Sequence, residues 1–203
     1  MTKVLIIGAS GSIGRVVARE LLQQTTAQLV LASRHPRRIP VTDPAREAAI
    51  RLDVTDDQAL TATLVGVDFV FAALSGQLDR YAQHLVVAMD HAQVKRLAFI
   101  TTMGIYQEIP AWLGESPDPY HNGILRPYRK AADLIEASDL DYTIIRPGWF
   151  DNGDPRYELT RKGEPFGGHD VSRAAIADLV ARMVNDPDFG RRESLGINRP
   201  QAH

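Results

Sequence analysis

The sequence of 203 residues contains no cysteine, which excludes disulfide bridges, thiolate zinc sites, iron–sulfur clusters and cysteine nucleophiles. It also lacks any apolar run close to the roughly 18 residues of a membrane-spanning helix. The first apolar run, residues 4–7, reaches a glycine at once and is too short for the core of a signal peptide. These absences predict a cytoplasmic protein without a membrane partner.

Neither sign of charge dominates, since 23 lysines and arginines stand against 25 acidic residues and the net charge is -2. A balanced composition gives no general basic surface, so no nucleic-acid partner is expected. The charge is nevertheless uneven: the residues before Asp43 include one acid, Glu20, and the bases Lys3, Arg15, Arg19, Arg34, Arg37 and Arg38. A local basic patch of this kind favours a small anionic ligand.

Short apolar runs typical of buried strands alternate along the chain with amphipathic segments typical of helices. Strands are expected at residues 4–7, 29–32, 49–52, 69–73, 97–100, 142–145 and 193–198, and helices at 13–24, 56–64, 78–91, 129–138 and 172–184. This alternation predicts an α/β fold in which a doubly wound, mostly parallel sheet carries helices on both faces. We expect residues 1–203 to form a single domain.

Three segments interrupt the alternation: 33–44 is rich in arginine and proline, 107–127 contains four prolines, and 149–170 contains four glycines. Each follows a predicted strand, so each belongs at the carboxyl edge of the sheet, where such folds bind ligands. We expect 107–127 and 149–170 to be binding loops or lids.

Three glycines stand between the first predicted strand and the first predicted helix. Gly8, Gly11 and Gly14 have the spacing G-x-x-G-x-x-G, which in this context is typical of a Rossmann dinucleotide site. The first glycine permits a tight turn, the second lets the backbone approach a pyrophosphate, and the third lets the helix lie close to the sheet. The N–H groups at the helix start, in Ser12 and Ile13, then face phosphate oxygens. A plain turn is the alternative.

The end of the second predicted strand selects the dinucleotide. An NAD site usually has a carboxylate about 20 residues after the glycines, but here the strand ends in Ser33-Arg34-His35-Pro36-Arg37-Arg38. A guanidinium pairs with a 2′-phosphate, which a carboxylate would repel. We therefore predict NADP(H) in preference to NAD(H), with Arg34 as the main contact and Ser10, Arg15 and Arg38 in support.

The third predicted strand is followed by Asp53 and Val54. There the Asp53 carboxylate is predicted to lie near the adenine amino group. A helix cap is the alternative role for this side chain.

With these motifs in order, the sequence resembles the atypical short-chain dehydrogenase/reductases, in particular the compact NmrA-like, NAD(P)-binding group. The matching positions cover nearly the whole chain: 8–15, Arg34, Asp53, 72–76, 101–104, Lys130, 138–148 and 171–178.

The resemblance implies roles for residues after the later strands. Ala72, Ala73 and Leu74 are expected to pass over the adenosine side and the ribose. Thr101 and Thr102 are expected near the nicotinamide, where a hydroxyl polarises a carbonyl or caps the backbone. The resemblance further implies that Lys130 binds the nicotinamide ribose and that Pro147 borders the nicotinamide.

One departure from the family pattern bears on catalysis. Such reductases typically carry Tyr-x-x-x-Lys, whereas here the residue four before Lys130 is Arg126, which cannot act as an ordinary general acid. Tyr128 is only two residues from Lys130 and so lies nearly opposite on a helix. The proton is then expected from a loop group, and His121 has a suitable ordinary pKa. Tyr106 and Tyr120 are further candidates.

Other side chains leave their roles open. The six histidines do not have metal-ligand spacing, so no metal site is expected. Trp112, Trp149 and Phe150 fall in the two long segments, where they either stack on a flat substrate or anchor the loops.

Two functions follow. The first is an NADPH-dependent oxidoreductase that reduces a small carbonyl, quinone or flavin-like acceptor by hydride transfer. The second is a redox sensor that binds NADP(H) without turnover and regulates a protein partner. An isomerase or epimerase has no distinctive residue here, and a homodimer is a family expectation only.

Overall fold

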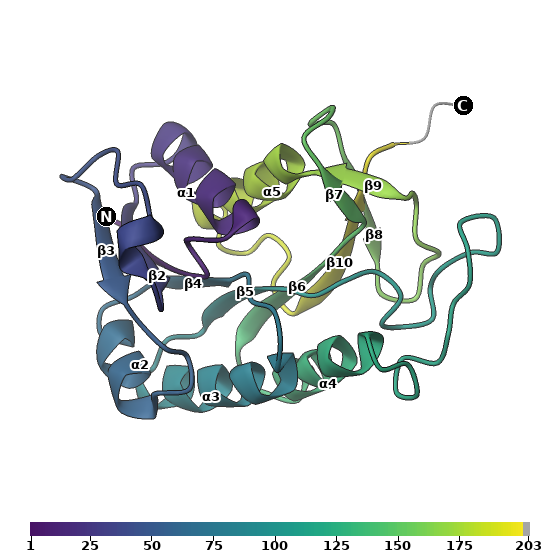
Figure 1. Ribbon diagram of the computed structural model, residues 1–203, viewed down its shortest axis with the longest axis horizontal. Helices are drawn as coiled ribbons and strands as arrows, with labels where there is room; N and C mark the ends of the chain where they lie inside the picture. The colour runs from purple at the N-terminus through teal and green to yellow at the C-terminus, as the bar shows by residue number, and fades with distance from the viewer. Residues whose placement is uncertain (201–203) are drawn as a thin grey trace.

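The computed structural model describes residues 1–200 and has a central sheet between two layers of helices (Figure 1). The strands are β1 (Lys3–Ile7), β2 (Gln28–Ser33), β3 (Glu47–Arg51), β4 (Phe69–Ala72), β5 (Arg96–Ile100), β6 (Asp141–Pro147), β7 (Trp149–Asp151), β8 (Glu158–Arg161), β9 (Asp170–Ser172) and β10 (Glu193–Asn198). The helices are α1 (Ser12–Gln24), the 3-10 turn η1 (Pro36–Arg38), α2 (Asp57–Leu64), α3 (Leu78–His91), α4 (Leu125–Glu136) and α5 (Arg173–Asn185). The predicted α/β architecture is confirmed.

The main sheet has the strand order β3-β2-β1-β4-β5-β6-β10-β8. All neighbours pair in parallel except β8, which runs antiparallel to β10. The chain leaves β1 toward β2 on one side and later returns to β4 on the other. In an open parallel sheet this reversal opens a crevice at the carboxyl ends of the strands, which is where ligands bind.

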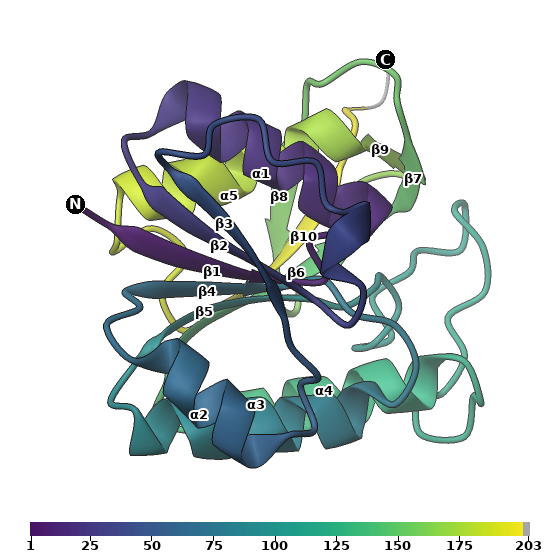
Figure 2. The ribbon, with the colours of Figure 1, turned by 60° about the vertical axis from the view of Figure 1, so that its left-hand side comes forward.

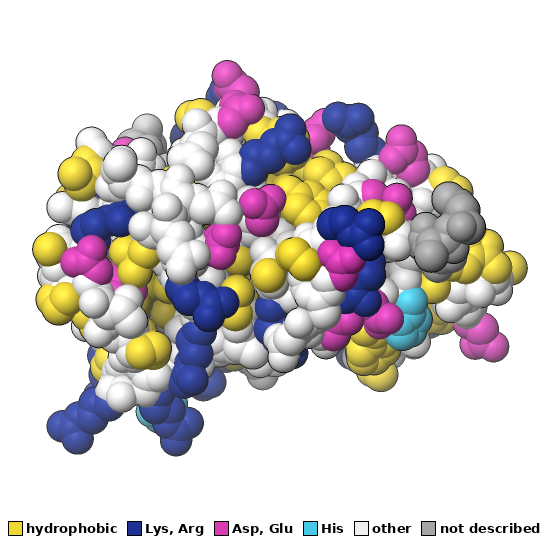
Figure 3. Space-filling view, turned by 90° about the horizontal axis from the view of Figure 1, so that it is seen from above, with side chains coloured by type: hydrophobic (Ala, Val, Ile, Leu, Met, Phe, Trp, Pro, Cys, Tyr) yellow, Lys and Arg dark blue, Asp and Glu magenta, His cyan; other side chains and the backbone are white. Residues whose placement is uncertain are grey.

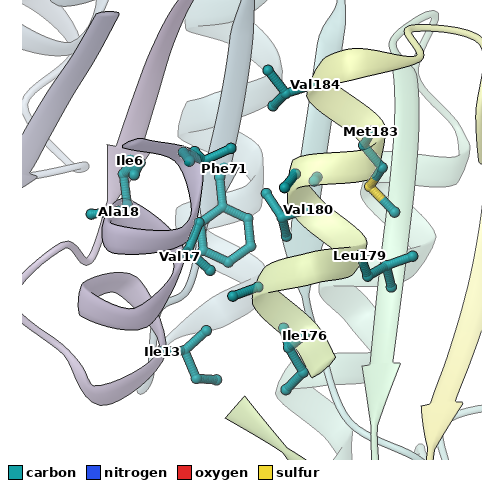
Figure 4. Packing of buried hydrophobic residues seen from close by; sticks show 14 of the residues in the cluster. Ile6, Ile13, Val17, Ala18, Phe71, Ile176, Leu179, Val180, Met183 and Val184 are labelled. Carbon is teal, nitrogen blue, oxygen red and sulfur yellow. The ribbon is translucent and has the colours of Figure 1, made fainter. Parts of the chain in front are cut away.

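Helices cover both faces of the sheet: α1 and α5 lie on one face, and α2, α3 and α4 lie on the other (Figure 2). The apolar stripe of α1 packs against α5, with Ile13 and Val17 of α1 beside Ile176 and Val180 of α5 (Figure 4). Phe71 of β4 is fully buried in the same cluster. This packing fixes the start of α1 at the carboxyl edge of the sheet.

The two long segments are more structured than the sequence indicates. Helix α4 begins at Leu125, four residues before the predicted start, so Pro127 lies in its first turn, where its missing N–H leaves no helical hydrogen bond unmade. Segment 149–170 is not a plain loop, because it contains β7 and β8 and reaches the first residue of β9. Strands β7 and β9 pair with each other. Within residues 1–200, no helix combines the length and the apolar character that a membrane span requires.

Candidate functional site

After β1, the backbone conformation and its close contacts require glycine at two positions. Gly8 has a φ of 92°, and a Cβ there would collide with the carbonyl oxygen of Ala73. A Cβ on Gly14 would collide with the backbone of Gly8 and Ala9. The N–H groups of Gly8 and Ala9 both donate to the Ala32 carbonyl of β2, at 3.1 and 3.2 Å. At Gly8 and Gly14 the chain therefore lies too close to neighbouring backbone to leave room for a side chain.

The start of α1 has the features of an anion site. Gly11 is the N-cap and supplies no side-chain acceptor, and the first turn contains no acidic residue. The first hydrogen bond of the helix runs from the Arg15 N–H to the Gly11 carbonyl, at 3.1 Å. The N–H groups of Ser12, Ile13 and Gly14 therefore have no partner within the helix and are available to an anion.

A cavity of about 190 Å³ lies beside this turn and joins residues that are far apart in sequence. Its walls come from the glycine loop and from the ends of three neighbouring strands. The lining residues are Ile7, Gly8, Ser10, Gly11, Ala32, Ser33, Arg34, Leu52, Asp53, Val54, Ala73, Leu74, Ser75 and Tyr81. Eight of the predicted cofactor-binding positions thus meet in one place: Gly8, Ser10, Gly11, Arg34, Asp53, Val54, Ala73 and Leu74.

The rim of this cavity on the β2 side is basic. Arg15, Arg34 and Arg38 are exposed, and within residues 1–200 none of them forms an ion pair with a carboxylate. The Arg15 guanidinium donates to the Arg38 carbonyl at 3.0 Å, which ties α1 to the turn after β2. Basic side chains protrude from this part of the molecule (Figure 3). The available cations make this rim suited to an anionic group.

Three polar side chains, Ser10, Ser33 and Asp53, also line the cavity. The hydroxyls of Ser10 and Ser33 are 2.8 Å apart, and Ser33 also accepts a hydrogen bond from the His35 N–H. Hydrogen bonds from the Thr55 N–H and hydroxyl, more than the nearby Arg34 guanidinium, hold the pKa of Asp53 below its usual value. Asp53 is therefore an ionised acceptor at neutral pH. It does not cap α2, whose N-cap is Asp56.

The structure does not bring Lys130 to this cavity. The buried stripe of α4 consists of Ala131, Ala132 and Ile135, and Tyr128 is half-buried against the same cluster. Lys130 lies off this stripe, because successive residues of a helix are turned by about 100°. Its side chain is exposed and lines a groove between α3 and α4. Tyr128 therefore lies on the inner side of α4, whereas Lys130 lies on its exposed side.

The remaining predicted positions lie at the ends of the central strands. Ala72 and Pro147 are buried in β4 and β6. The Thr101 hydroxyl is buried and donates to the Ile145 carbonyl at 3.0 Å, which is the backbone-capping alternative. Thr102, next to it, is half-buried and has no such bond among the described residues.

Each of the three candidate proton donors, Tyr106, Tyr120 and His121, contacts a carboxylate. The Nδ1 atom of His121 lies 2.6 Å from Asp118, and 88% of the His121 side chain is exposed. The Tyr106 hydroxyl donates to Glu136 at 2.7 Å, and burial raises the pKa of this tyrosine. The Tyr120 hydroxyl donates to Asp133 at 2.9 Å. None of the three lines the cavity described above.

A buried ion pair that the sequence does not signal holds the segment after β5. The Arg146 guanidinium of β6 is fully buried and donates to the Glu108 carboxylate at 2.5 Å. Glu108 also accepts hydrogen bonds from the N–H groups of Gly104 and Tyr106, at 3.1 and 2.8 Å. The sequence shows only that Arg146 is the single charged residue of the run 142–147, which does not identify its partner.

Comparison with known proteins identifies the chain. A family model described as NAD(P)H-binding matches residues 8–187. The chain belongs to this NAD(P)H-binding family. A Rossmann-fold NAD(P)-binding family protein from Shigella flexneri is 37% identical, with a TM-score of 0.86 over 100% of this chain and 95% of that one. The predicted Rossmann fold and the predicted membership of an NAD(P)-binding family are both confirmed.

Other relatives of this NAD(P)H-binding protein are more distant. A short-chain dehydrogenase/reductase from Veillonella parvula, crystallised with NADP, is 24% identical, with a TM-score of 0.88 over 100% of this chain and 96% of that one. The uncharacterized sugar epimerase YhfK of Bacillus subtilis is 27% identical over 198 residues, 94% of this chain and 91% of the relative. Protein TIC 62 of pea chloroplasts is 31% identical over 117 residues, which are 54% of this chain but 21% of that protein.

The residues present fit the cofactor class that the family implies. A dinucleotide phosphate requires backbone without side chains, as at Gly8 and Gly14, and a helix start without a side-chain cap, as in α1. It also suits the exposed arginines beside the cavity, which have no ion pair among the described residues 1–200.

Proposed function

We propose that the protein is an NADPH-dependent oxidoreductase that reduces a small carbonyl, quinone or flavin-like acceptor by hydride transfer. The observation that carries the cofactor preference is Arg34, which lines the cavity at the end of β2 and has no ion pair within residues 1–200. NAD sites have a carboxylate at this point of the fold, and a free guanidinium there suits a 2′-phosphate. The Veillonella relative, which was crystallised with NADP, supports the same preference.

Backbone and side-chain groups of the cavity bind different parts of the dinucleotide. The N–H groups at the start of α1 hold the pyrophosphate, and Arg34, with Arg15 and Arg38, holds the 2′-phosphate. Asp53 accepts hydrogen bonds at the adenosine end. When bound, NADPH supplies the hydride. Thr102 and Pro147, at the ends of β5 and β6, border the reacting end, and the proton comes from water or from a nearby loop group.

A second function is favoured by the structure of α4. Lys130 faces a groove between α3 and α4, and Arg126 stands where such reductases have tyrosine. A site without the Tyr–Lys pair suits a redox sensor, which binds NADP(H) without turnover and reports it to a protein partner. An E. coli protein of the same fold, 20% identical with a TM-score of 0.80, is nevertheless described as an anaerobilin reductase.

Turnover distinguishes these two functions. NADPH oxidation is measured with a panel of quinones, aldehydes and flavins, alongside calorimetric binding of NADP⁺. The oxidoreductase function predicts consumption of NADPH that depends on at least one acceptor class. Tight NADP⁺ binding without turnover of any acceptor would reject it in favour of the sensor. A cytoplasmic location and a homodimer remain predictions.

A further inference from the structure

Two aromatic side chains form a shelf just beyond β6. The rings of Trp149 and His169 are stacked, with centroids 6.2 Å apart and planes inclined by 23°. Trp149 is 64% exposed, so most of its indole surface is open to solvent despite the stacking on His169. Exposed indoles are costly in water and are common where a flat ligand binds. We call Trp149 and His169 the aromatic shelf.

The backbone beneath the aromatic shelf is tightly fixed. Strands β7 and β9 pair Trp149 with Asp170, and the Trp149 N–H donates to the His169 carbonyl at 2.8 Å. A Cβ on Gly148 would collide with the same carbonyl oxygen. Because Trp149 stands on the paired strand β7 and His169 directly precedes its partner β9, the backbone under both rings is held in place and the shelf is preorganised for a ligand.

His169 is also held by its polar neighbour. Its Nδ1 atom lies 2.7 Å from the Asp170 carboxylate, and its other ring nitrogen has no partner within residues 1–200. A protonated imidazole held in this way donates through Nδ1 to Asp170 and has Nε2 left for a ligand oxygen. His121 makes a similar pair with Asp118, but no described aromatic ring stacks on it.

The position of the aromatic shelf links it to the cofactor site. Pro147 and Gly148 lead directly from β6 to Trp149, and the Met103 N–H, after β5, donates to the Pro147 carbonyl at 3.2 Å. Strands β7 and β9 lie at the same end of the sheet as the start of α1 (Figures 1 and 2). The shelf therefore stands at the edge where the fold binds ligands, beyond the strands that border the reacting end of the cofactor.

We propose that the aromatic shelf binds the acceptor, and that the acceptor is a planar conjugated carbonyl compound of the quinone class. Its ring system stacks on Trp149 and its carbonyl oxygen accepts a hydrogen bond from Nε2 of His169. Aliphatic carbonyl compounds lack the flat π surface that this stacking needs. The proposal rests on the proposed oxidoreductase function, because it names the substrate class of that site.

The chain offers a matched test, since its two tryptophans, Trp112 and Trp149, are both exposed. Trp112→Phe leaves only the shelf indole to fluoresce, and Trp149→Phe leaves only the control indole. Each variant, saturated with NADP⁺, is titrated with menadione, a planar quinone, and with camphor, a non-planar ketone. We expect saturable quenching by menadione in Trp112→Phe, no saturable quenching in Trp149→Phe, and no effect of camphor in either.

His169 is tested in the Trp112→Phe background. Replacement by Asn is expected to weaken menadione binding about three- to tenfold, the value of one hydrogen bond. The control His91→Asn, an exposed histidine in the last turn of α3, should leave menadione binding unchanged. Equal saturable quenching in Trp149→Phe, or none in Trp112→Phe, would overturn the shelf. Calorimetry with NADP⁺ on the same variants separates the shelf proposal from the proposed function. If NADP⁺ still binds but menadione causes no saturable quenching, only the shelf proposal is rejected. If the unaltered protein does not bind NADP⁺, the proposed function is rejected.

Discussion

The glycine loop after β1 and the segment after β5 lie at the same edge of the sheet, but different interactions hold them. Backbone contacts shape the glycine loop, with the N–H groups of Gly8 and Ala9 on the Ala32 carbonyl. The segment after β5 depends on a side chain, the Glu108 carboxylate, which joins Arg146 to two backbone N–H groups. A backbone conformation that only glycine can adopt is visible in the sequence as a glycine pattern. An ion pair between residues far apart in the sequence, such as Glu108 and Arg146, has no such pattern.

The largest effect is expected at the buried pair. Glu108→Ala leaves the Arg146 charge without its carboxylate in the protein interior and should lower the free energy of unfolding by about 3–5 kcal/mol. Chemical denaturation measures this loss. Glu115→Ala, an exposed acidic residue of the same segment, should change stability by less than about 0.5 kcal/mol. Equal stability of the two variants would show that the pair does not hold the segment.

A smaller effect, on binding, is expected at the glycine loop. Gly14→Ala forces a Cβ against the Gly8 carbonyl, so α1 must move away from the phosphate-binding turn. NADP⁺ affinity should fall at least about tenfold, or 1.4 kcal/mol, in calorimetry. The matched control is Gly123→Ala, where a Cβ meets no other atom within 4 Å. Unchanged affinity in Gly14→Ala would mean that close approach of the backbone is not required.

The smallest effect is expected at Asp53, where local hydrogen bonds from Thr55 lower the carboxyl pKa. A carboxyl whose pKa is lower in the folded state stabilises the fold above its unfolded value, near 3.8, and this stabilisation disappears as the pH falls through the folded value. Asp53→Asn should therefore reduce the acid dependence of stability below about pH 4 and leave the dependence near neutrality unchanged. Unfolding curves at several acidic pH values compare the two proteins, and superimposable acid profiles would contradict the assignment.

Most of the fold could be predicted because hydrophobic periodicity determines strands and helices locally. The first strand, the glycine turn and α1 form within a few residues of one another, and Arg34 follows from its place after β2. Strands β7, β8 and β9 have three or four residues each, too few for a periodic signal, and they form only because partner strands are present. The family motif places Lys130 at the nicotinamide ribose, but a motif does not give the rotation of α4, which the apolar stripe through Tyr128, Ala131 and Ile135 sets.

Beside the glycine loop, we propose that the arginines at the end of β2 select NADP(H) over NAD(H). Parallel calorimetry of NADP⁺ and NAD⁺ with the unaltered protein and with Arg34→Ala tests it most directly. We expect tighter binding of NADP⁺ than of NAD⁺. Removal of the guanidinium should cost about 1.5–3 kcal/mol in NADP⁺ binding and leave NAD⁺ binding little changed. Tighter binding of NAD⁺ by the unaltered protein, or an equal loss for both dinucleotides in Arg34→Ala, would contradict it.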